Sequence, residues 1–141
     1  MINTPHISVD GIVKLYDAQD RYRGIVLIER KNPPHGWAFP GGFVDIGETI
    51  ETALRREMKE EISLDVQIER LLGIYSDPGR DPRFHTVSAV FVCRATGTPE
   101  AADDARRVHV VENAEARGLP LVFDHARILA DYLDGRQCVT D

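Results

Sequence analysis

The sequence has few cysteines and no long apolar run. Cys93 and Cys138 are the only cysteines among its 141 residues, and neither has a CxxC partner. This argues against a disulfide scaffold and a zinc site, so we expect Cys93 to be buried in a strand and Cys138 to be a thiol of the tail. No stretch approaches the ~18 apolar residues of a membrane span, and residues 1–6 lack a basic region followed by an apolar run. We therefore expect the mature protein to be the whole chain, in the cytoplasm.

Positive charge is also scarce. The sequence has 17 Lys and Arg residues against 23 Asp and Glu residues, which gives a net charge of -6 and a pI near 5.3. General binding to nucleic acid or to acidic membranes needs a basic surface, so we expect neither as a partner. A phosphorylated substrate must then be bound by local cations or by a metal. The length and the 43% of hydrophobic residues suit one domain over residues 1–141.

Apolar segments separated by Pro, Gly and polar residues predict an α/β fold. The segments 24–30 and 86–94 are apolar on both alternating faces, which is typical of central strands covered on both sides. Residues 32–48 are too rich in Pro and Gly for regular structure and predict an ordered functional loop. The expected strands are 7–15, 24–30, 65–76, 86–94 and 108–111, and the expected helices are about 49–62 and 124–133. This order predicts a layered domain with helices on both faces of one sheet.

Three glutamates of the first expected helix share one face. Glu57, Glu60 and Glu61 stand at positions i, i+3 and i+4. The apolar arc of this helix contains Glu57 and Glu61, so two carboxylates face the core. Packed together they repel each other unless a cation neutralises them, and their oxygen atoms favour Mg²⁺ or Mn²⁺. The alternative, a solvated acidic patch, fits less well with this position and with the glycine-rich loop that enters the helix.

Residues 42–64 resemble the Nudix box, GX5EX7REUXEEXGU, in which U is an aliphatic residue. The matching positions are Gly42, Glu48, Arg56, Glu57, Met58, Glu60, Glu61 and Leu64, in unbroken register. Ser63 stands where the pattern has glycine. That glycine serves the helix exit, where a left-handed residue is needed, so we expect a small geometric penalty and unchanged chemistry. The resemblance implies the Nudix α/β/α sandwich, with a mixed sheet between helices.

Nudix proteins generally cleave a diphosphate by attack of water on phosphorus, and the resemblance implies roles for the matching residues. The implied metal ligands are Glu57, Glu61, Glu60 and the carbonyl of Gly41, and the implied catalytic residues are Glu60, Arg56 and Glu48. Glu60 either ligates a further metal or accepts the proton from water, while Arg56 orients the glutamates and Glu48 braces the loop against the helix. Asp103 and Asp104 lie where some members supply another carboxylate, although an exposed acidic loop explains them equally well.

The turn at residues 76–85 indicates the substrate. It carries Arg80, Arg83 and His85 on a loop that is stiffened by prolines and lies between two expected strands, which suits phosphate or ribose oxygens. Alternatively, Asp77 and Asp81 pair with these arginines and only hold the turn. The segments SDPGRDPRFHTVSAVF and FDHARIL resemble ADP-ribose pyrophosphatases of the Nudix family, which implies cleavage of ADP-ribose to AMP and ribose 5-phosphate. The expected substrate-binding residues are Arg30, Gly42, Arg80, Arg83, His85 and Phe123.

Aromatic residues near the loop and the last helix are candidates for stacking on adenine. They are Trp37, Phe39, Tyr75 and Phe123, of which we expect Phe39 to belong to the core. We expect Asp124 and His125 to cap the last helix.

Two other functions remain open. One is a pyrophosphohydrolase for nucleoside triphosphates or damaged nucleotides, because the box reads the diphosphate and not the base. The other is a non-catalytic sensor of ADP-ribose or a nucleotide. The intact acidic positions of the box favour an enzyme over a sensor. Many Nudix proteins are homodimers, but no interface can be derived from this sequence.

Overall fold

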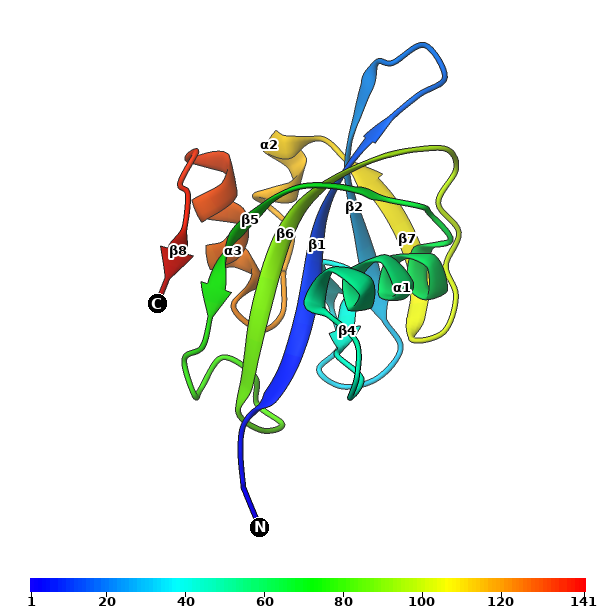
Figure 1. The fold of residues 1–141 in the computed structure, drawn as a ribbon. Coiled ribbons are helices and arrows are strands. Elements are labelled where there is room, and N and C mark those ends of the chain that lie inside the picture. Colours follow the sequence, from blue (N-terminus) through cyan, green and yellow to red (C-terminus); the bar gives the residue numbers. More distant parts are fainter.

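Most of the apolar segments form strands of one mixed sheet in the computed structural model, which describes residues 1–141 (Figure 1). The strands are β1 (His6–Tyr16), β2 (Tyr22–Arg30), β3 (Trp37–Ala38), β4 (Gly41–Phe43), β5 (Gln67–Tyr75), β6 (Thr86–Thr96), β7 (Ala105–Val111) and β8 (Val139–Thr140). Their order is β3-β2-β1-β6-β5-β8, with β4 paired to β1 and β7 paired to β2. The β1–β6 and β5–β8 pairs are parallel and the others are antiparallel.

The sheet separates two apolar cores. Helix α1 (Ile50–Ile62) covers one face, where Leu54, Met58 and Ile62 are fully buried against strand residues. Helices α2 (Asn113–Ala116) and α3 (His125–Leu133) cover the other face, where Ala116 and Ile128 are fully buried (Figure 1). The predicted α/β/α sandwich is therefore confirmed. No helix is both long and apolar enough to cross a membrane.

The bounds of the main elements agree with those expected, but several short elements were not predicted. Residues 32–48 contain β3 and β4, and β7 begins at Ala105 rather than at 108. Both β3 and β4 are held by pairing with distant strands, such as Gly41 with Asp10, which a local pattern cannot indicate. The short β8 and α2 were also missed. Cys93 is buried and Cys138 is exposed, as expected.

Both ends of α1 follow from single residues. Thr49 is the N-cap, and its side chain accepts a hydrogen bond of 3.1 Å from the backbone N–H of Thr52. Ser63 is the C-cap in the left-handed conformation, with φ 61° and ψ 32°, and its N–H donates to the carbonyl of Lys59. Ser63 thus adopts the left-handed conformation at the helix exit, where the family pattern has glycine.

Strand β1 changes partner along its length, and this places the functional residues. Its residues Ser8–Asp10 pair with β4, whereas its far end, Lys14–Tyr16, pairs with β2. β4 is thereby held over the beginning of β1, and α1 follows it in the chain. Strand β6 pairs in parallel with the other edge of these same residues, so β1 lies between β4 and β6.

Candidate active site

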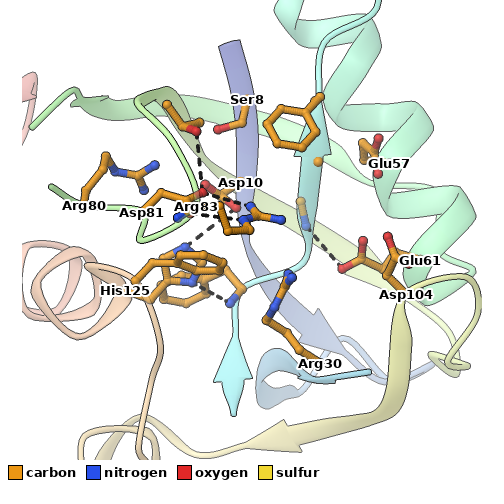
Figure 2. Close-up of a pocket in the computed structure, with 16 residues that line it drawn as sticks. Ser8, Asp10, Arg30, Glu57, Glu61, Arg80, Asp81, Arg83, Asp104 and His125 are labelled. Carbon is orange, nitrogen blue, oxygen red and sulfur yellow. Dashed lines mark hydrogen bonds and ion pairs between the residues drawn. The ribbon is translucent and has the colours of Figure 1, made fainter. Parts of the chain in front are cut away.

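One cavity, of about 150 Å³ and partly open to solvent, is lined by residues from several strands, two helices and the loops between them. It is lined by Ser8, Asp10, Arg30, Phe39, Gly41, Gly42, Phe43, Glu57, Glu61, Arg80, Asp81, Arg83, Thr86, Asp104, Phe123 and His125. Figure 2 shows acidic residues of α1 and of a neighbouring loop on one side of the cavity and arginines on the other. We call Glu57, Glu61 and Asp104 the carboxylate wall. We call Arg30, Arg80 and Arg83, together with Phe123, the arginine wall.

The carboxylate wall is built on α1. Glu61 is only 4% exposed, and its Oε1 accepts one long hydrogen bond of 3.4 Å, from the N–H of Gly41. Burial, and secondly the neighbouring charge of Glu57, raise the pKa of Glu61 to about 8. Burial also raises the pKa of Glu57, although Arg56 acts in the opposite direction. The wall therefore holds two carboxylates whose negative charge is poorly compensated by the protein.

Arg56 binds Glu48, Glu57 and Glu60 from a position outside the cavity lining. Its Nη1 donates to Glu57 at 2.9 Å and to Glu60 at 3.1 Å, and its Nη2 donates to the carbonyl of Phe43 at 3.0 Å. Its Nε and Nη2 both bond to Glu48, which raises the pKa of Arg56 and lowers that of Glu48. Arg56, Glu48 and Glu60 do not line the cavity. They connect the loop before α1 to the residues that do.

Gly42, at the first position of the Nudix box, has no room for a side chain. A Cβ atom on Gly42 would lie 2.3 Å from the carboxyl carbon of Glu57, so any side chain there would displace the carboxylate. Gly42 thus lets β4 approach the carboxylate wall closely, and the backbone of β4 closes that side of the cavity.

The carboxylate wall fits a divalent cation. Glu61 and Glu57 are hard oxygen ligands, and a bound cation would neutralise the repulsion that raises their pKa values. No three His, Cys, Asp or Glu side chains are close enough to hold a metal alone, so backbone, water or substrate oxygens would complete the coordination. Of the two acidic loop residues, only Asp104 lines the cavity; its Oδ1 accepts a hydrogen bond from Asn32 at 3.2 Å.

The arginine wall is organised around one aromatic ring. The guanidinium carbons of Arg30 and Arg83 lie 5.0 and 5.4 Å from the centroid of the Phe123 ring. Arg30 is oriented by a bond from its Nε to the carbonyl of Pro34, and Arg83 by two bonds to Asp81. Phe123 has a φ of 57°, which is rare for a bulky residue and often marks a functional site.

Some side chains of the turn at residues 76–85 stabilise the protein by pairing with other residues, and some also line the cavity. Asp81 pairs with Arg83, as the alternative interpretation of the turn expected. The expected partnership of Asp77 with Arg80 is wrong, because Arg80 instead makes two bonds to Asp124, at 2.9 and 2.7 Å. His85 does not line the cavity, and its Nε2 lies 2.9 Å from the carbonyl of Ser76.

Some of the expectations for aromatic and capping residues are confirmed, and others are not. Phe39 belongs to the core, as expected, at 2% exposure, and Tyr75 is also fully buried. Trp37 packs edge-on against His109, outside the cavity, so Phe123 is the partly exposed stacking candidate in the lining. Asp124 is the N-cap residue of α3, as expected, but its side chain makes no cap hydrogen bond and is bonded to Arg80 instead, and His125 is the first residue of the helix.

A buried polar network at the floor of the cavity was missed by the sequence analysis. Asp10 is 8% exposed and accepts a short hydrogen bond from the hydroxyl of Ser88. His125 is 2% exposed; its Nδ1 accepts the N–H of Phe39 at 3.0 Å, and its Nε2 lies 3.8 Å from Oδ1 of Asp10. Burial raises the pKa of Asp10 and lowers that of His125 to about 3. The one available signal was a charged residue inside the apolar segment ISVDGIVKL.

Residues 5–132 match the NUDIX domain. The chain belongs to the Nudix family. It is 44% identical over 133 residues to an ADP-ribose pyrophosphatase of Methanocaldococcus jannaschii, across 92% of this chain and 73% of that protein. A putative 8-oxo-dGTP diphosphatase of Bacillus subtilis is 32% identical over 117 residues, across 82% and 74% of the two chains.

A solved structure gives the same fold. The bifunctional NMN adenylyltransferase/ADP ribose pyrophosphatase of Francisella tularensis, complexed with AMP and a manganese ion, has a TM-score of 0.78 at 26% identity. The match covers 94% of this chain and 42% of that one. This protein is a Nudix hydrolase, an enzyme class that generally needs a divalent metal, in agreement with the carboxylate wall.

Proposed function

We propose that this Nudix hydrolase splits ADP-ribose with water into AMP and ribose 5-phosphate, using Mg²⁺, for which Mn²⁺ can substitute. The observation that carries the proposal is the arrangement of the cavity, in which the carboxylate wall faces the arginines and Phe123 also contributes to the lining. The likeness to the ADP-ribose pyrophosphatase of Methanocaldococcus jannaschii supports the same substrate.

Each wall meets one demand of the reaction. Glu57 and Glu61, with the backbone at Gly41, would hold the metal, which when bound neutralises the diphosphate and lowers the pKa of the attacking water. Water then forms a new P–O bond while the bridging P–O bond breaks. Glu60 either joins the ligands or accepts the proton from water, and Arg56 and Glu48 keep the glutamates in place.

The arginine wall would bind the rest of the substrate. Arg30 and Arg83 present positive charge beside Phe123, which suits oxygen atoms of the diphosphate or ribose and the face of a base. Arg80 contributes charge from a fixed position because Asp124 holds it. Gly42 admits the diphosphate close to β4. His85, outside the lining, would act through the turn that carries Arg83.

The net charge of -6 supports a free nucleotide as substrate rather than a nucleic acid. A cytoplasmic location and a homodimer stay predictions, and size-exclusion chromatography with light scattering tests the second of them.

The test is a screen of nucleoside diphosphate derivatives and nucleoside triphosphates with purified protein and Mg²⁺, with chromatographic identification of the products. We expect AMP and ribose 5-phosphate from ADP-ribose, and no products when EDTA replaces the metal. Faster release of pyrophosphate from nucleoside triphosphates would contradict the proposal. It would favour the second candidate, a nucleotide pyrophosphohydrolase, which the likeness to the Bacillus subtilis protein supports.

A non-catalytic sensor is the third candidate. Binding of ADP-ribose without metal-dependent release of AMP would support it, and the same screen detects that outcome. The buried Glu61 and the partly buried Glu57 of α1 favour the enzyme, because a pure sensor gains nothing from their mutual repulsion.

A further inference from the structure

Two buried side chains at the floor of the cavity, Asp10 and His125, have no part in the metal site or the arginine wall. Asp10 stands on β1 between Val9 and Gly11, and His125 is the first residue of α3. Both line the cavity although they are 8% and 2% exposed (Figure 2). A carboxylate buried this deeply is unfavourable unless its oxygen atoms receive hydrogen bonds, so its free atoms are informative.

The hydrogen bonds leave one free acceptor and one free donor. Oδ2 of Asp10 accepts the hydroxyl of Ser88, whereas Oδ1 accepts no hydrogen bond from the protein. Nδ1 of His125 accepts the N–H of Phe39, so the proton of the neutral ring lies on Nε2. Nε2 and Oδ1 are 3.8 Å apart, too far for a hydrogen bond between them.

Both free atoms are accessible from the cavity. The only side-chain N or O atom that is sealed from solvent without a hydrogen-bond partner is Nη1 of Arg70. Oδ1 of Asp10 and Nε2 of His125 are therefore open to a ligand. They are also held rigidly, because Ser88 lies on β6 and the N–H of Phe39 comes from the backbone beside β3.

The chemistry of the pair excludes an anion. A phosphate oxygen can only accept, and it would be repelled by Asp10. A neutral group that donates to Oδ1 and accepts from Nε2–H satisfies both atoms. In a nucleotide sugar, a ribose hydroxyl has this property, and so does the edge of adenine, with its amino group as donor and N1 as acceptor.

We propose that Asp10 and His125 form a specificity pair that recognises such a neutral donor–acceptor group of the substrate, a ribose hydroxyl or the amino edge of adenine. This rests on the proposed function, because ADP-ribose supplies both groups. A ligand that lacks the group leaves two buried polar atoms unpaired, and sites of this kind discriminate by tenfold or more (roughly 1.4 kcal/mol per factor of ten).

The test measures binding by isothermal titration calorimetry in EDTA, where no turnover occurs. Four ligands are compared: ADP-ribose, inosine diphosphate ribose, ADP-ribose with a 2′-deoxy adenosine, and ADP. In the second, a carbonyl acceptor replaces the amino group and N1 becomes a donor, so the donor and the acceptor of the adenine edge are exchanged. The third lacks one ribose hydroxyl, and the fourth lacks the terminal ribose. We expect the ligand without the recognised group to bind at least ~10-fold more weakly than ADP-ribose. Binding of all four within threefold of each other (about 0.7 kcal/mol) overturns the proposal without any variant.

The variant Asp10→Asn then tests whether the loss of binding affinity arises from Asp10 and His125. With the Ser88 hydroxyl donating to the remaining oxygen, the amide nitrogen faces the cavity and cannot accept, so the penalty for the defective ligand should fall below threefold. Asp131→Asn is the matched control, because Asp131 is a buried carboxylate, bonded to Tyr75 at 2.8 Å, outside the lining. It should retain the full penalty. A penalty that persists in Asp10→Asn, or that vanishes in Asp131→Asn, overturns the assignment.

The outcomes separate this proposal from the proposed function. If ADP-ribose binds but is not hydrolysed when metal is added, the proposed reaction is wrong and the pair is still judged by the ligand series. If ADP-ribose is hydrolysed and the series is flat, only the pair is wrong. Absence of ADP-ribose binding in EDTA overturns the pair, which needs no metal, and absence of hydrolysis with Mg²⁺ as well overturns both.

Discussion

The two walls of the cavity are built in different ways. The carboxylate wall takes Glu57 and Glu61 from one helix, and Arg56, which orients Glu57, is the adjacent residue in the chain. On the other side, Arg80 is bonded to Asp124, 44 residues away, and at the floor Asp10 is bonded to Ser88, 78 residues away. The first wall depends on helix geometry and a short loop. The second depends on the packing of the whole sheet, so substitutions there should affect stability as well as binding.

The largest effect is expected on the carboxylate wall. Glu57→Gln and Glu61→Gln should each lower the Mg²⁺-dependent rate of AMP release by about 10²–10³-fold, because a neutral amide stabilises the metal and the developing charge poorly. Neither variant should lose much stability in urea denaturation, since burial already disfavours the charged form of each carboxylate. Glu51→Gln, on the exposed first turn of the same helix, is the control and should keep its rate within about twofold. Near-normal rates in both variants would refute the metal assignment.

The second largest effect is expected across the cavity, on the Arg80–Asp124 pair. The side chains are 4% and 14% exposed, so Asp124→Asn leaves the charge of Arg80 buried without its counterion. The free energy of unfolding should fall by about 3 kcal/mol. Asp134→Asn breaks the exposed pair with Arg117 and should change it by less than about 1 kcal/mol. Equal losses in the two variants would mean that the wall does not depend on buried pairing.

The carboxylate wall and the floor of the cavity should also respond to pH with opposite sign. In the metal-free protein, Glu61 has a folded-state pKa of about 8, above its ordinary value of 4.5. Its stabilising contribution is therefore complete below pH 4.5 and is lost as the pH rises towards 8, by at most about 1.4 kcal/mol per pH unit. Glu61→Gln should become more stable relative to wild type between pH 5 and 8 in urea denaturation with EDTA. Parallel pH profiles for the two proteins would contradict the raised pKa.

His125, at the floor of the cavity, should lose stability in the other direction. Its folded-state pKa of about 3 lies below the ordinary 6.5, so the unfolded chain binds the proton more readily and stability falls as the pH drops below 6.5. His125→Asn keeps an acceptor for the N–H of Phe39 but does not titrate. Its free energy of unfolding should fall less than that of wild type between pH 7 and 5. Asp10, whose raised pKa acts oppositely, is present in both proteins. A variant as acid-sensitive as wild type would refute the buried neutral ring.

The same difference explains how much could be predicted from the sequence. The helical period alone places Glu61 on the buried face of α1, and spacing to Glu48 indicates the loop that Arg56 joins to the helix. The partner of Arg80 could not be predicted, because two nearby aspartates competed with one brought in by α3. His125 was interpreted as a cap for the same reason. Its real partner, the N–H of Phe39, is 86 residues away and is reached only when the sheet has formed.

The smallest effect is expected at Ser63, the one residue of the locally encoded side that departs from the family pattern. Its left-handed conformation costs a residue with a Cβ atom about 1 kcal/mol, and its hydroxyl makes only one exposed bond, of 3.3 Å, to the carbonyl of Glu100. Ser63→Gly and Ser63→Ala both lose this bond, but only the alanine keeps the backbone strain. The glycine variant should therefore be more stable than the alanine variant by about 1 kcal/mol in urea denaturation, with unchanged rates of AMP release. If the alanine variant is as stable as the glycine variant, Ser63 has no backbone strain at the end of α1.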